Sequence, residues 1–180
     1  MDPDAYLCQL AEIFNGISVN TPSLSAIIAI ILAGLLLLAS GFASASEIAF
    51  FSLSPSDLND IEEGNHPSDG KISNLLADSE RLLATILITN NFVNVTIIML
   101  CNFFFMNVFV FHSPLAEFLI LTVILTFLLL LFGEIMPKIY AKHNSLTMAR
   151  RAAGVLTHLE KMFRWLSWAL IKFTHIINKH

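Results

Sequence analysis

Three long apolar stretches dominate the pattern of the chain. The first runs from Leu24 to Ala39 and continues, interrupted by serines, to Leu53; the second runs from Leu82 to Phe111 and the third from Leu115 to Phe132. A bilayer core about 30 Å thick is crossed by about 20 helical residues, and each stretch supplies that length. The pattern predicts an all-α membrane protein with three transmembrane helices.

The polar segment between the first two stretches, residues 54–81, predicts short helices. Ser54 followed by Pro55 is typical of a helix N-cap with proline at the first helical position. Gly64, Pro67 and Gly70 are expected to break the segment. Four acidic side chains in its first half form either an ordinary solvated surface or a region that concentrates cations: Asp57, Asp60, Glu62 and Glu63.

The segment after the third stretch, Ser145 to Asn178, predicts one long amphipathic helix. Its apolar face has three- and four-residue spacing: Leu156, Leu159, Phe163, Leu166, Leu170, Phe173 and Ile177. A helix with basic side chains opposite such a face lies along a membrane surface; a fourth span is the competing interpretation. The chain thus divides into an N-terminal segment (1–23), a three-span domain (24–143) and a juxtamembrane helix (144–180).

The composition agrees with a membrane protein. Only 13% of the residues are charged and the mean hydropathy is +0.71, whereas soluble domains carry about 25% charged residues. Residues 1–23 contain acidic but no basic side chains, unlike a cleavable signal peptide. Cys8 and Cys101 indicate no disulfide framework, and no nucleic-acid partner is expected.

The distribution of basic residues predicts the orientation. Eight of the ten lysines and arginines follow the third stretch, and the other two, Lys71 and Arg81, lie between the first and second. The segment before the first stretch and the link between the second and third have none. The positive-inside rule therefore predicts an outside N-terminus and a cytoplasmic C-terminus. The membrane itself is expected to be a bacterial inner membrane.

Polar residues interrupt the first two spans on defined faces. Ser40, Ser44 and Glu47 share one helical face, and small residues beside them, among them Gly41, allow another backbone to come close. In the second span Asn90 and Asn94 are four residues apart on one face, with Asn91 beside them. Side chains of these types form either a cation site or hydrogen bonds that hold spans together.

The end of the third span combines a glutamate, a proline and a lysine. Pro137 has no N–H, so the carbonyl of Gly133 loses its helical partner. That carbonyl lies beside the Glu134 carboxylate, and Lys138 lies one turn further on. Together with the serines and asparagines these ligands are all hard oxygens, which suit Mg²⁺, Ca²⁺ or Na⁺. The alternative is a carboxylate at the membrane edge paired with Lys138 or Lys142.

Three stretches, SGFASASEIAFFSLS, LLATILITNNFVN and FGEIMPK, resemble in order and spacing the signatures of the DUF21 transmembrane domain. This is the membrane part of the CorC and CNNM (cyclin M) magnesium transporters. The resemblance covers about residues 24–178. It implies three spans with short cytoplasmic helices and a juxtamembrane helix. It also implies a homodimer in the lipid membrane that exports Mg²⁺, with Na⁺ as the coupling ion.

The resemblance implies residue roles as well. The implied Mg²⁺ ligands are Ser40, Ser44, Asn90, Asn94, the Gly133 carbonyl and Glu134, and the implied supporting residues are Glu47, Asn91, Pro137 and Lys138. Cytoplasmic CBS domains that bind adenine nucleotide are expected in the full-length protein. Some relatives are associated with gliding motility, so a membrane scaffold or assembly component with a structural or regulatory ion site is the alternative function. An enzyme is not expected, because the spans contain no catalytic constellation.

Overall fold

The computed structural model describes residues 18–110, 114–165 and 168. Its elements, in chain order, are β1 (Ser18–Val19), α2 (Leu24–Phe51), α3 (Pro55–Glu62), α4 (Asp69–Ala77), α5 (Ser79–Val108), β2 (Phe109–Val110), α6 (Pro114–Leu128), the π-helix η1 (Leu129–Ile135), α7 (Met136–His143) and α8 (Ser145–Met162). Three helical stretches are long and apolar enough to cross a membrane: Leu24–Phe51, Ser79–Val108 and Glu117–His143. The predicted all-α, three-span membrane fold is confirmed.

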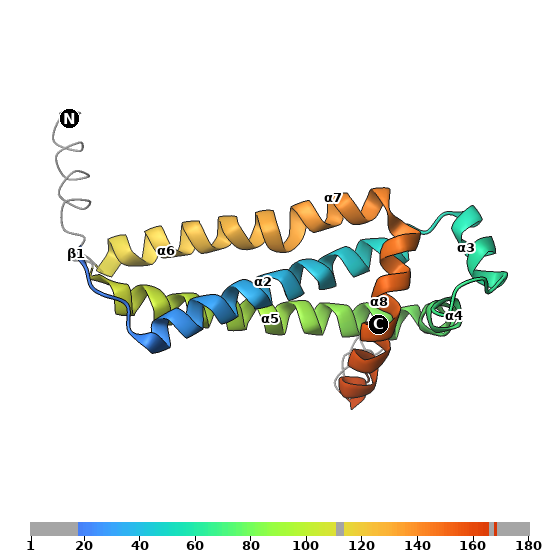
Figure 1. Cartoon of the computed structure of the whole chain (residues 1–180), viewed down its shortest axis with the longest axis horizontal. Coiled ribbons are helices and arrows are strands. Elements are labelled where there is room, and N and C mark those ends of the chain that lie inside the picture. The colour runs from blue at the N-terminus through green and yellow to red at the C-terminus, as the bar shows by residue number, and fades with distance from the viewer. Residues whose placement is uncertain (1–17, 111–113, 166–167, 169–180) are drawn as a thin grey trace, which may run out of the picture.

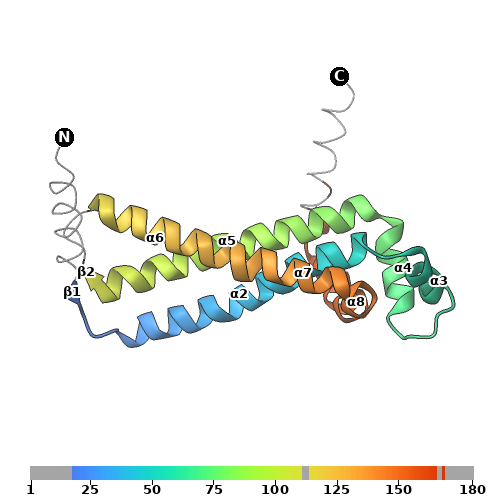
Figure 2. The same ribbon diagram turned by 90° about the horizontal axis from the view of Figure 1, so that it is seen from above.

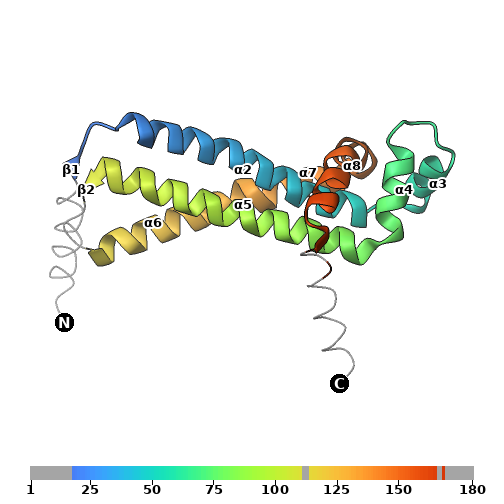
Figure 3. The same cartoon turned by 90° about the horizontal axis from the view of Figure 1, so that it is seen from below.

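The three spans run side by side along the long axis of the molecule (Figure 1). The span α2 packs against both α5 and the η1–α7 segment. The two short strands lie at one end of the bundle, called here the strand end, and α3, α4 and α8 lie at the other, called the α8 end (Figure 2). Toward the strand end α6 diverges from α2 (Figures 2 and 3).

The third span is longer than its apolar run predicted. The apolar run ends at Phe132, but the helix continues through η1 and α7 to His143. Pro137 lies in the first turn of α7, directly after the π-helical residues. Local π geometry is one way in which a membrane helix continues past a proline. The proline therefore changes the hydrogen-bond register of the span and does not end it.

A two-residue ladder closes the strand end. β1 pairs antiparallel with β2, with Ser18 opposite Val110 and Val19 opposite Phe109. The ladder ties the segment before α2 to the end of α5. The sequence predicts no strand here, because so short a pairing has no periodicity to detect.

The predicted cap of the first short helix is confirmed. The Ser54 hydroxyl accepts from the Asp57 backbone, and the Asp57 carboxylate accepts from the Ser54 N–H at 2.9 Å, which completes a capping box. Gly64 breaks the segment with a positive φ of 69°, and Pro67 lies between α3 and α4. The predicted break at Gly70 is wrong: Gly70 lies in the first turn of α4.

The larger apolar core lies at the α8 end, where α8 crosses the bundle (Figure 1). The first half of α8 is buried against protein, through Met148, Ala149, Ala152, Ala153 and Leu156. Its small residues allow close contact with α2, α4 and α5. The helix ends at Met162, short of the predicted Asn178. The remainder of that predicted helix, apart from residues 163–165 and 168, lies outside the described residues.

A candidate cation site between the spans

A cluster of polar side chains joins α2 to α5 inside the bundle. Ser40 Oγ lies 2.9 Å from Asn90 Oδ1 and 2.6 Å from Asn94 Oδ1, and Ser44 Oγ lies 3.5 Å from Asn90 Oδ1. Ser40 and Ser44 are fully buried. The two serines predicted on one face of the first span therefore meet the two asparagines predicted on one face of the second.

The cluster holds more acceptor oxygens than protons. Ser40 has one hydroxyl hydrogen, so it can donate to only one of the two amide oxygens at a time. The other amide oxygen then faces a hydroxyl lone pair at hydrogen-bond distance. Either one amide turns its NH₂ group toward Ser40, or a positive charge lies among the oxygens. A cation would select the arrangement in which all the oxygens converge.

The third span closes the cluster on a second side. A Cβ on Gly133 would lie 3.2 Å from Ser40 Oγ, and a Cβ on Gly41 would lie 3.0 Å from Pro137 Cγ and 3.2 Å from the Phe132 carbonyl oxygen. Glycine at both positions is what allows this approach. The sequence analysis expected small residues around Gly41 to admit a neighbouring backbone, and the structure identifies that neighbour as η1 and the start of α7.

The π register adds a carbonyl that the sequence analysis missed. In η1 the Met136 N–H donates to Leu131 O, five residues back. The next bond in this register would run from Pro137 to Phe132, and in the α register it would run from Pro137 to Gly133. Because proline has no N–H, residue 137 donates to neither carbonyl. The Phe132 carbonyl is therefore a second candidate oxygen ligand beside the predicted Gly133.

Lys138 has a different partner from the one expected. Its Nζ forms an ion pair with Glu47 Oε2 at 3.2 Å, and both side chains are about one third exposed. The expectation that Lys138 balances Glu134 one turn away is not met in this structure. A π turn holds more residues than an α turn, so side chains on either side of η1 do not keep α-helical phase. The pair instead links α2 to α7.

Two predicted site residues stand apart from the cluster. Glu134 is half-buried and forms no hydrogen bond or ion pair with any described residue. Asn91 is exposed on α5 and does not join Asn90 and Asn94. Ser46, which follows the motif serine Ser44, donates within its own helix to Phe42 O at 2.7 Å. The structure thus brings together Ser40, Ser44, Asn90, Asn94 and Gly133.

The chemistry of the cluster is that of a hard-oxygen site. Within residues 18–110, 114–165 and 168, no group of three or more histidine, cysteine, aspartate or glutamate side chains is close enough to hold a metal. The converging atoms are hydroxyl and amide oxygens, which suit Mg²⁺, Ca²⁺ or an alkali cation. Neutral oxygens alone bind such ions weakly, so a nearby carboxylate is needed to strengthen the binding of a cation.

At the α8 end the charged groups have structural roles. Asp69 is 1% exposed and accepts a bidentate pair from Arg150, at 2.8 Å from Nε and 3.1 Å from Nη2. That contact lowers the pKa of Asp69 and raises the pKa of Arg150. Hydrogen bonds in the capping box, first from the Ser54 backbone, lower the pKa of Asp57. Asp57 therefore stabilises a helix end, although it belongs to the predicted acidic surface.

Three membrane-length helices, two of them joined by a cluster of polar side chains, define a multi-pass α-helical membrane domain. The chain belongs to the cyclin M transmembrane N-terminal domain family (CNNM), whose family model matches residues 30–180. This confirms the resemblance drawn from the three sequence stretches.

Two curated relatives are similar to the chain. One is a UPF0053 protein of Haemophilus influenzae, 32% identical over 138 residues, which are 77% of this chain and 32% of the relative. The other is the UPF0053 inner membrane protein YfjD of Escherichia coli (strain K12), 27% identical over 140 residues, which are 78% of this chain and 32% of the relative. The chain spans about a third of the length of these relatives.

Proposed function

We propose that this chain is the transmembrane domain of a Mg²⁺ transporter that exports the ion through an oxygen-lined site between the spans, coupled to Na⁺. The observation that carries the proposal is the convergence of Asn90 Oδ1 and Asn94 Oδ1 on Ser40 Oγ, at 2.9 and 2.6 Å. Membership of the cyclin M transmembrane family supports it.

The proposed orientation has the strand end outside the cell and the α8 end in the cytoplasm of a bacterium. All ten basic residues follow the first span, eight of them after the third apolar stretch, and one relative is described as an inner membrane protein. We propose a homodimer, with CBS domains in the full-length protein. The chain matches about a third of each relative's length, which leaves room for such domains in a full-length protein.

The cluster acts by exchanging hydrogen bonds for ion contacts. Without an ion, the Ser40 proton satisfies one amide oxygen and holds α2 to α5. When Mg²⁺ enters, Ser40 turns its lone pairs toward the ion, and the amide oxygens replace part of the hydration shell. Mg²⁺ loses water reluctantly, so several fixed oxygens must be offered together. The backbone carbonyls of Phe132 and Gly133 add to this set from the third span.

Glu134 supplies the charge in this proposal. It follows Gly133 directly in η1, and among the described residues it has no partner that holds its carboxylate elsewhere. The one nearby lysine of the motif, Lys138, is already paired with Glu47. The carboxylate is therefore available to a cation at the η1 side of the cluster.

Ion-dependent thermal unfolding of the purified chain in detergent tests the proposal. A ligand at 100 times its dissociation constant raises the free energy of unfolding by about 2.7 kcal/mol, so Mg²⁺ should raise Tm by several degrees. Asn94→Ala and Glu134→Gln should abolish the shift. Asn91→Ala is the matched control, because Asn91 is exposed on the same helix and its variant should keep the full shift.

Reconstituted flux separates transport from the scaffold alternative. The observation that favours a scaffold is that the serines and asparagines already bond to one another across two spans. A scaffold predicts a folded chain with no Mg²⁺-dependent shift in Tm, or a shift without Mg²⁺ movement across vesicles. Na⁺-dependent Mg²⁺ flux that Asn94→Ala removes and Asn91→Ala retains is the result expected here.

A further inference from the structure

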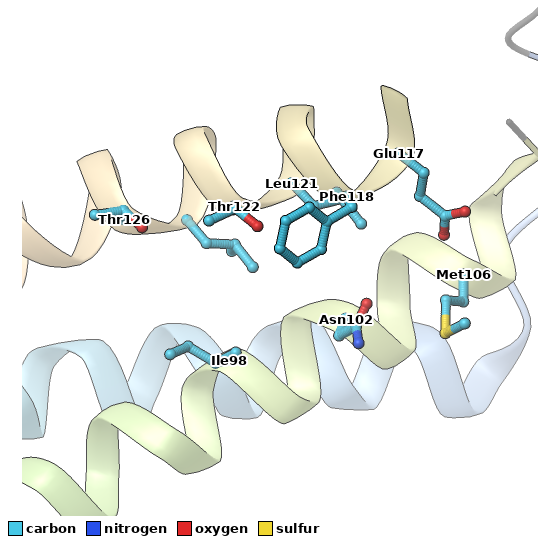
Figure 4. A pocket seen from close by; sticks show the side chains of 9 residues that line it. Ile98, Asn102, Met106, Glu117, Phe118, Leu121, Thr122 and Thr126 are labelled. Carbon is cyan, nitrogen blue, oxygen red and sulfur yellow. The ribbon is translucent and has the colours of Figure 1, made fainter. Parts of the chain in front are cut away.

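A second polar region lies between α5 and α6, nearer the strand end than the Ser40 cluster. A crevice of about 350 Å³ opens there between the two helices (Figure 4). Much of its wall is apolar, formed by Ile98, Met106, Phe118, Leu121 and Leu125. Four polar side chains share the space: Asn102 from α5, and Glu117, Thr122 and Thr126 from α6.

None of these four polar side chains forms a hydrogen bond or ion pair within the part of the chain that the structure describes. Other hydroxyls in the spans behave differently. Thr89 and Thr96 each donate to the carbonyl four residues back at 2.8 Å, which is the usual local solution in a helix. Asn102, Thr122 and Thr126 lie within the spans, where unpaired polar groups are costly in contact with lipid, and Glu117 lies at the start of the third span. Their shared cavity therefore points to water or an ion.

We propose that this crevice is a vestibule that binds a hydrated divalent cation on its way between the strand-end surface and the Ser40 cluster. The inference rests on the proposed transport function and gives it an outer route. At 1.5 Å per residue, Thr126 lies about 10 Å before Gly133 along the third span, and Asn102 lies about 12 Å beyond Asn94 along α5. The crevice thus begins about two helical turns from the cluster.

The polar groups of the crevice determine how much of its water shell a bound ion keeps. One carboxylate, Glu117, and three neutral groups are too few to replace the water of Mg²⁺, which is commonly held through one or two carboxylates with several waters retained. Glu117 is the fourth residue of α6, at the outer end of the crevice, where it attracts cations and repels anions. The threonines and Asn102 offer hydrogen bonds to the water shell further in.

Cysteine accessibility tests the vestibule. In proteoliposomes of the full chain with Cys8→Ala and Cys101→Ala, Thr122→Cys and Thr126→Cys should react with a membrane-impermeant cationic methanethiosulfonate from the strand-end side. Val123→Cys is the matched control, since Val123 is 66% exposed but does not line the crevice. It should react at least about tenfold more slowly, because a thiol without water is poorly ionised.

Charge and Mg²⁺ dependence test the cation site itself. Thr122→Cys should react faster with the cationic reagent than with an anionic one, and Mg²⁺ alone should slow the reaction. Adding Glu117→Gln should remove both effects. Thr122→Cys reacting no faster than Val123→Cys would mean that lipid or a second copy of the chain fills the crevice, and would overturn the proposal. Fast reaction without charge preference or Mg²⁺ protection would overturn it too, since the crevice would hold only water.

The two proposals fail separately. If the vestibule tests succeed but Asn94→Ala leaves the Mg²⁺-dependent shift in Tm unchanged, the crevice binds cations and the central site is wrong. If the central site responds as expected while Thr122→Cys matches Val123→Cys, transport stands and its outer route lies elsewhere. Unchanged Tm of each cysteine variant without Mg²⁺ verifies that the fold is intact.

Discussion

The contact of α2 with η1 and α7 at Gly41 gives a prediction about packing, for which Gly34 in the same helix serves as the reference position. In Gly41→Ala the new methyl group would lie 3.0 Å from Pro137 Cγ and 3.2 Å from the Phe132 carbonyl oxygen. Both atoms belong to rigid parts of the third span, a proline ring and the backbone. The same helix contains Gly34, where no atom lies within 4 Å of an added Cβ.

The two variants share the gain in helix propensity and differ in packing. Replacing glycine by alanine within a helix stabilises it by about 1 kcal/mol. At Gly34 this gain should appear alone. At Gly41 the overpacking costs about 1–3 kcal/mol, so the free energy of unfolding of Gly41→Ala should lie about 1–3 kcal/mol below that of Gly34→Ala. For a chain of this length about 2–4 °C corresponds to each kcal/mol.

Thermal unfolding in one detergent, followed by circular dichroism, measures the gap between the two variants. We expect Gly34→Ala to unfold at or above the wild-type Tm and Gly41→Ala several degrees below Gly34→Ala. The Mg²⁺-dependent shift should also shrink in Gly41→Ala, because the methyl group pushes the Phe132 carbonyl away. Equal Tm values for the two variants would refute the argument that the third span approaches α2 at Gly41.

Two further predictions concern charged pairs. Because the Arg150 contact holds the pKa of Asp69 below its ordinary value of 3.8, the stabilisation is fully present above about pH 4 and is lost as the pH falls through the lowered pKa. Tm of the wild type should therefore fall more steeply below pH 4 than Tm of Asp69→Asn, and parallel curves would contradict this assignment. For Glu47 and Lys138, a double-mutant cycle of Glu47→Gln and Lys138→Met should give a coupling energy of about 0.5–1 kcal/mol in detergent; no coupling would mean that the pair does not link α2 to α7.

Much of this fold follows from one-dimensional patterns. The spans follow from the length of the apolar runs, and the faces of Ser40 with Ser44 and of Asn90 with Asn94 follow from α-helical spacing. The N-cap of α3 follows from Ser54 and Pro55. These features are local, since each depends on residues within one or two turns. The meeting of the two faces in space could be expected only because few other places in a membrane suit so many polar groups.

The features that sequence did not reveal depend on contacts between distant segments. Asn91 lies next to Asn90 yet is exposed, because the side of α5 that is covered depends mainly on the position of α2. The first half of α8 is buried by α2, α4 and α5. A periodic apolar face looks the same in sequence whether protein or lipid covers it, so this contact could not be predicted. The β1–β2 ladder exists because two chain ends meet at one end of the bundle.

The π-helical segment decides how the motif at the end of the third span works. If this segment were α-helical, Lys138 would lie one turn from Glu134, and only the Gly133 carbonyl would lose its hydrogen-bond donor. In the structure Lys138 pairs with Glu47 of α2. Because Met136 donates to Leu131 in the π register, the donor that Pro137 lacks is the one that the Phe132 carbonyl would receive. A lysine bound to another span no longer neutralises Glu134. The change of register thus leaves the Phe132 carbonyl without a donor from residue 137 and Glu134 without Lys138 as a partner. A carboxylate free of a lysine is what the proposed site, made mostly of neutral oxygens, needs from the third span.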